Sequence, residues 1–108
     1  MNKQGTIDFL RSLIRTRRRL IRKDAGRKNR DAMDKAADFI EIHLDAHEHK
    51  YTRAGLARFF VKYQNIIRSL IPGPGSRSHD KLMRDFNRHL FLCKVEYECN
   101  EIDKEIQS

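Results

Sequence analysis

Apolar residues recur every three or four positions through most of this chain, and that periodicity constrains its fold more than any other feature. From Thr6 to Asp24 the apolar residues share one half of a helical wheel and the cations fill the other half, as in an amphipathic helix. We expect Thr6 to be the N-cap and Gly26 to end the helix. The apolar half consists of Ile7, Phe9, Leu10, Leu13, Ile14, Leu20 and Ile21. Arg17 is the exception, because it projects from the apolar half. We expect it to face inward and pair with an acid of another helix; the alternative is a contact with another subunit or a ligand.

The second periodic segment runs from the candidate cap Asn29 to Glu48, and its acids form a stripe opposite the core face. Their spacings are three and four residues, and like charges at those spacings repel one another on a helix. We interpret the stripe either as a solubilising outer face or as a docking strip for a basic surface, such as the first helix of another copy. The acids are Asp31, Asp34, Asp38, Glu41, Asp45 and Glu48.

Two further helices are expected, on either side of the connection Pro72-Gly73-Pro74-Gly75. Thr52 is the expected cap of the first of these, and Ser78 of the second. Residues 92–99 alternate apolar and polar, which is typical of a strand, but no other segment could pair with such a strand. We therefore expect a helix that breaks near Lys94 or turns a second face inward. The residues of this second face, which could also be a dimer contact, are Val95, Cys99, Ile102 and Ile106.

The sequence therefore predicts an all-α fold, a compact bundle of four helices over about 6–24, 29–48, 53–71 and 79–106, in a single domain of residues 1–108. No apolar run approaches the roughly 20 residues of a membrane span, so no membrane contact is expected. The start of the chain does not have the pattern of a signal peptide. Cys93 and Cys99 point in different directions on a helix, so we expect reduced thiols and a cytoplasmic location.

Charge is distributed in blocks of alternating sign. The net charge is +8, and residues 1–30 carry eleven basic and two acidic groups, whereas residues 31–50 carry two and six. Residues 51–89 carry eight basic and two acidic groups, and residues 90–108 carry two and five. A net positive charge of this size favours an anionic partner, either nucleic acid or an acidic protein.

The basic half of the first helix, together with the residues that follow it, is the main candidate for contact with phosphates. Arginine predominates there, and its planar fork suits bidentate phosphate contact. These candidates are Arg11, Arg15, Arg18, Arg19, Arg22, Lys23, Arg27, Lys28 and Arg30. A second basic stripe with similar spacing consists of Arg77, Lys81, Arg84 and Arg88. The two stripes could bracket one polyanion if their helices lie side by side, or the second could pair with the acidic stripe of residues 31–48.

The segment YTRAGLARFFVKYQNIIRSLI, residues 51–71, resembles the helix-turn-helix of many bacterial and phage repressors. The resemblance implies that Tyr63, Gln64, Asn65 and Arg68 meet base edges in the major groove. Where that pattern usually has glycine in its turn, this chain has Val61, which is poorly suited to a positive φ. One uninterrupted amphipathic helix would explain the same apolar positions.

Nothing in the sequence has the pattern of a catalytic site, so we do not expect an enzyme. His43 and His47 lie four residues apart and could share a metal ion, but the further ligands of a zinc site are not evident, and we predict neither a metal nor a cofactor. The leading prediction is a small basic regulator or accessory factor that binds nucleic acid, DNA more than RNA. The alternative is an adaptor or inhibitor that grips a complementary protein through its charged strips. Homodimerisation, basic strip to acidic strip, is a third possibility.

Overall fold

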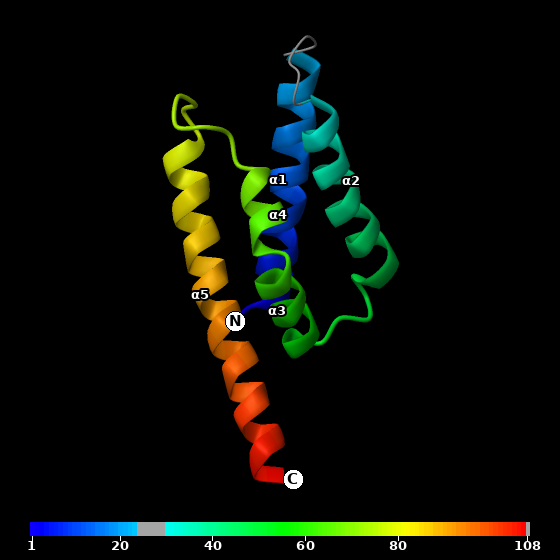
Figure 1. Ribbon diagram of the computed structural model, residues 1–108, viewed down its shortest axis with the longest axis vertical. Coiled ribbons are helices and arrows are strands. Elements are labelled where there is room, and N and C mark those ends of the chain that lie inside the picture. Colours follow the sequence, from blue (N-terminus) through cyan, green and yellow to red (C-terminus); the bar gives the residue numbers. More distant parts are fainter. Residues whose placement is uncertain (24–29, 108) are drawn as a thin grey trace.

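The computed structural model describes the backbone of residues 1–23 and 30–107, and the side chains of residues 1–20 and 34–99. Within those residues the chain forms five helices and no strand: α1 (Lys3–Lys23), α2 (Arg30–His47), α3 (Arg53–Lys62), α4 (Gln64–Ser69) and α5 (His79–Gln107). The helices pack lengthwise into a bundle (Figure 1), and the prediction of an all-α bundle is confirmed. The predicted end of the first helix at Gly26 and the predicted cap Asn29 lie outside the described residues.

Helix α1 begins three residues before the predicted start, because Asn2 and not Thr6 caps it. The Asn2 side-chain oxygen accepts a hydrogen bond from Gly5 N (3.1 Å), and its carbonyl oxygen accepts one from Thr6 N (3.0 Å). Asparagine satisfies the free amides of a first turn as well as threonine does. The predicted cap, Thr6, is instead inside the helix and 1% exposed, so its hydroxyl is available to another element.

The core is formed by one face of each helix. Leu10 and Leu13 of α1, Ile40 and Leu44 of α2, and Leu56 and Phe60 of α3 are fully buried. Helix α5 packs along α3, where the rings of Phe60 and Phe86 are 5.7 Å apart. This continuous apolar contact supplies most of the driving force for folding a chain that is rich in charge.

The segment predicted as one helix over 53–71 is divided at Tyr63. Thr52 caps α3 as expected, its hydroxyl oxygen accepting from Gly55 N at 3.0 Å. Tyr63 then leaves helical geometry (φ −107°, ψ 23°), and α4 begins at the next residue. The ring of Tyr63 packs against Phe39 and Phe59, with centroids 5.0 and 5.2 Å away. The break therefore lies where the chain turns an aromatic side chain toward α2.

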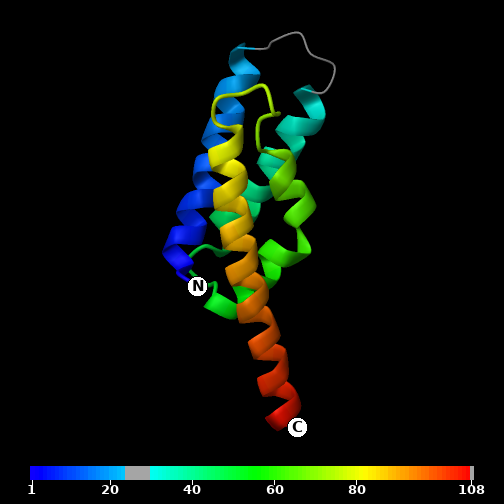
Figure 2. The same ribbon diagram turned by 90° about the vertical axis from the view of Figure 1, so that its left-hand side faces the viewer.

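Helix α5 is continuous from His79 to Gln107, so the alternating segment 92–99 is helical and does not break near Lys94. Ser78 precedes it and accepts from Leu82 N (3.0 Å), and His79 Nδ1 donates to the carbonyl oxygen of Pro72 at 2.7 Å, which ties the proline-glycine connection to the helix. The second half of α5 extends beyond the other four helices (Figures 1 and 2). None of the described helices has both the length and the apolar character needed to cross a membrane.

Candidate nucleic-acid interface

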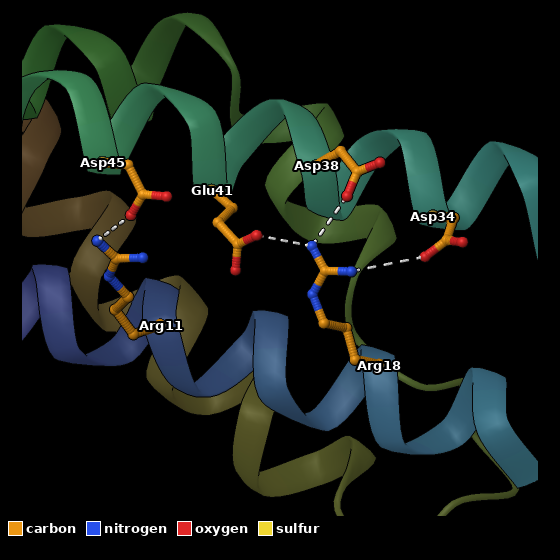
Figure 3. A network of polar contacts seen from close by, with 6 residues as sticks. All are labelled: Arg11, Arg18, Asp34, Asp38, Glu41 and Asp45. Atoms are coloured by element: carbon orange, nitrogen blue, oxygen red, sulfur yellow. Dashed lines mark hydrogen bonds and ion pairs between the residues drawn. The ribbon is translucent and has the colours of Figure 1, made fainter.

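Two arginines of α1 lie against the acidic stripe of α2. Arg11 Nη2 is 2.8 Å from Asp45 Oδ1 and 2.7 Å from Glu48 Oε2. Arg18 Nη2 is 2.9 Å from both Asp38 Oδ1 and Glu41 Oε1 (Figure 3). The Nη1 atom of Arg18 is also 3.9 Å from Asp34 Oδ1. Within the chain, the described part of the acidic stripe is thus a docking strip for the first helix.

This pairing follows from the spacing of the two sets. Arg11 and Arg18 are seven residues apart and share one face of α1. The acids also recur over two turns, and α2 runs antiparallel to α1, so each guanidinium meets a separate group of carboxylates (Figure 1). The hydrogen bond that Arg11 donates to Glu48 is the largest cause that raises the pKa of Arg11, and the bond that Arg18 donates to Asp38 does the same for the pKa of Arg18.

The predicted basic half of α1 therefore divides into two sets. Arg11 and Arg18 are half-buried and ion-paired, whereas Arg15 and Arg19 are exposed and make no ion pair with the described residues. The other predicted cations of this region are outside the described side chains: Arg22, Lys23, Arg27, Lys28 and Arg30. Of the residues that can be placed, Arg15 and Arg19 are thus the ones available to an external anion.

The second basic stripe is entirely exposed. It comprises Arg77 in the connection before α5 and Lys81, Arg84 and Arg88 on α5 itself. None of these four forms an ion pair within the described residues, and the acidic stripe of α2 that was a candidate partner is occupied by α1. The alternative in which this stripe neutralises α2 is therefore wrong for the residues that the structure describes.

The two basic sets lie on neighbouring helices. Thr6 Oγ1 of α1 is 3.2 Å from His89 Nδ1 of α5, and the Phe9 ring stacks on the His89 ring with centroids 4.7 Å apart. This contact joins the first two turns of α1 to the middle part of α5. Contact of both stripes with one polyanion stays a prediction.

His89 is the residue at this junction that sequence analysis did not single out. It is 9% exposed, and burial is the largest cause that lowers its pKa; the nearby charge of Arg88 lowers it further, while Asp85 acts in the opposite direction. A histidine on the inner face of a helix has no sequence pattern that distinguishes it from other core positions. The contact of His89 with Thr6 exists only because α1 and α5 pack together at this point.

The residues predicted to read bases are not arranged as in a helix-turn-helix. Val61, the expected turn position, lies inside α3, and Tyr63 alone separates α3 from α4, whereas that motif needs a turn of three or four residues. Tyr63 is half-buried among aromatic rings, and Gln64 donates to Val61 O at 3.0 Å. Asn65 and Arg68 are exposed. Contact of this set with bases stays a prediction, without the turn on which the resemblance rested.

Of the remaining residues that the sequence singles out, Arg17 and Cys93 are buried, His43 is half-buried and Cys99 is exposed. Arg17 is 6% exposed, which confirms that it faces inward. His43 lies among aromatic rings, 4.6 Å from Phe39 and 5.2 Å from Phe59 between centroids, and no group of three or more metal-ligating side chains occurs in the described part of the chain. Cys93 is buried and Cys99 is exposed, and both are free thiols.

Comparison of the chain with protein-family models, with curated proteins and with solved structures gave no match.

Proposed function

We propose that the protein binds nucleic acid, duplex DNA in preference to RNA, through phosphate contacts from the exposed cations of α1 and α5. The observation that carries this proposal is the division of the basic residues. Arg11 and Arg18 are neutralised by α2, whereas Arg15, Arg19, Arg77 and Lys81 stay exposed without a carboxylate partner among the described residues. In the folded chain the described acids of α2 thus pair with Arg11 and Arg18. An excess of positive charge is left on α1 and α5.

Physical chemistry favours a polyanion as the partner of such a surface. Guanidinium groups form bidentate contacts with phosphate oxygens. A duplex presents one phosphate charge per ~1.7 Å of axis, so a row of cations along a helix can contact several of them at once. Contacts of this kind hold the duplex without reading its sequence. The proposed activity is therefore general duplex binding by a small accessory factor or regulator.

The protein-binding alternative loses part of its support. It relied on a basic and an acidic strip that were both exposed, and the acidic strip now pairs with α1 of the same chain. The basic face could still meet an acidic protein, and binding of such a partner in place of duplexes is one outcome of the test below.

Two double variants test the proposal. Arg15→Gln with Arg19→Gln removes two exposed cations, and Arg11→Gln with Arg18→Gln removes two paired cations of the same helix. Binding of a labelled short duplex and of a single-stranded RNA is measured by fluorescence anisotropy between about 50 and 200 mM salt. We expect the first variant to weaken duplex binding and to lower the slope of log K against log salt by about 1 for each phosphate that the variant no longer neutralises. The second variant should bind more nearly as the parent does.

Circular dichroism checks that both variants keep the helical content of the parent. An equal weakening of binding in the two variants would show that only net charge matters and would contradict the assignment of the interface. A parent protein that shifts neither duplex nor single strand at about 50 mM salt would overturn the proposed function.

A further inference from the structure

Helix α5 carries an apolar pair on the face turned away from the bundle. Its inner face is formed by Phe86, His89 and Cys93, which are 3%, 9% and 0% exposed. Phe91 and Val95 lie on the opposite side of the helix and are 66% and 43% exposed. They are two of the three large apolar side chains that are exposed in the described part of the chain, and they are one helical turn apart.

Two charged residues continue this pair along one line of α5. Arg88, Phe91, Val95 and Glu98 follow one another at spacings of three, four and three residues. This is the spacing of the contact positions in a two-stranded coiled coil. Arg88 and Glu98 are both exposed, and neither forms an ion pair with the described residues. From its first residue to its last, the line therefore consists of a cation, two apolar side chains and an anion.

We infer that α5 pairs with α5 of a second copy in antiparallel orientation, with Phe91 against Val95 and Arg88 against Glu98 of the other chain. The order of the charges determines the orientation. A parallel pair would bring Arg88 onto Arg88 and Glu98 onto Glu98, and like charges opposite each other are unfavourable. The antiparallel pair turns both of these contacts into attractions.

The register agrees with the length of the helix. Arg88 and Glu98 are equally far from Cys93, and so are Phe91 and Val95. Cys93 is also the midpoint of α5, which runs from His79 to Gln107. Two helices in this register overlap along their whole lengths. The second half of α5, which extends beyond its own bundle in Figure 2, would then lie along the first half of α5 of the other copy.

The proposed dimer does not depend on the proposed function, but it changes the set of cations that are left to contact nucleic acid. It assigns Arg88 to the contact between copies and leaves Arg15, Arg19, Arg77, Lys81 and Arg84 to the polyanion. It also differs from pairing of a basic strip with the acidic stripe of α2, because that stripe is occupied within each chain.

The dimer is tested by exchanging the charges of Arg88 and Glu98. Sedimentation velocity over a concentration series gives the dimer dissociation constant of each variant. We expect the parent to show a monomer–dimer equilibrium. Arg88→Glu places two carboxylates at each contact and Glu98→Arg places two guanidinium groups there, so each single variant should raise the dimer dissociation constant about tenfold or more. The double variant R88E/E98R should regain the parental constant, and so should an equimolar mixture of the two single variants.

The single variants are the decisive arm, because in an antiparallel pair they replace two attractions by two repulsions, whereas a parallel pair would have two like-charge contacts in the parent and in each single variant alike. Arg77→Glu makes the same change of charge outside α5 and should leave the dissociation constant unchanged. Phe91→Asp, an exposed position, should abolish the dimer while the circular dichroism spectrum stays helical. A parent that is monomeric at all concentrations, or single variants that dimerise like the parent, would overturn the inference.

Discussion

The guanidinium of Arg18 on α1 is 2.9 Å from a carboxylate oxygen of Asp38 on α2, twenty residues later in the chain. The same nitrogen is 2.9 Å from Glu41, so one cation holds two acids that would otherwise repel each other along α2. Arg15, one turn earlier, has no such partner in the described part of the chain. Two arginines of one helix thus serve different purposes, and only their neighbours on α2 distinguish them.

Replacing Arg18 by Gln should lower the free energy of unfolding by about 1 kcal/mol, since it leaves Asp34, Asp38 and Glu41 uncompensated on a partly exposed surface. This destabilisation should shrink at high salt, which screens the repulsion between these carboxylates. Urea denaturation at low and high salt measures both effects. Arg15→Gln is the matched control, and its unfolding free energy should stay within about 0.5 kcal/mol of the parent. Equal unfolding midpoints for the two variants at low salt would contradict the assigned role of Arg18.

Helical periodicity was enough to predict the fold class, because an amphipathic face must be buried against another helix. The inward position of Arg17 and the helical state of residues 92–99 also followed from the pattern. Local signals were less decisive at helix ends. Asn2 and Thr6 are both good capping residues, and the structure uses Asn2. The break at Tyr63 could not be predicted, since it coincides with packing of the Tyr63 ring on Phe39 of another helix.

The candidate site was predictable as a set of cations but not as a surface. Sequence spacing identified both the basic and the acidic stripe, yet which stripe meets which depends on the order in which the helices pack. Arg11 and Arg18 were therefore grouped with Arg15 and Arg19, although α2 neutralises the first two. The role of His89 cannot be predicted from the sequence, because its contact with Thr6 joins residues 83 positions apart.

The stability of the junction between α1 and α5 should depend on pH through His89. Burial lowers the pKa of His89 in the folded chain below its ordinary value of 6.5, so the unfolded chain binds more protons between these two values. The contribution of His89 is then fully present above pH 6.5 and is lost as the pH falls from there toward the lowered pKa. Urea midpoints at about pH 7.5 and 5.5 measure the change. His89→Asn should flatten this part of the profile, and an unchanged slope would contradict the assignment to His89.

The start of α3 depends on one side chain. Thr52→Ala removes the hydroxyl that accepts from Gly55 N at 3.0 Å, and we expect it to lower the free energy of unfolding by about 1 kcal/mol. Thr52→Ser keeps an oxygen in the same place and should stay close to the parent. Denaturation in urea compares the three proteins. If serine and alanine destabilise equally, the effect comes from the methyl group of Thr52 and not from the cap.

The two thiols should differ sharply in reactivity, because only one of them is exposed to a reagent. Cys93 is fully buried, and burial, the largest cause, raises its pKa to about 12, whereas Cys99 is exposed on α5. Since the thiolate is the nucleophile, an aromatic disulfide reagent at about pH 8 should modify one thiol per native chain quickly and the second only as the chain unfolds. Cys99→Ser should remove the fast reaction, and Cys93→Ser should leave it intact. In denaturant both thiols of the parent should react together. A fast reaction that persists in Cys99→Ser would mean that the contact between α5 and α3 opens readily, and that Cys93 is not held in the core.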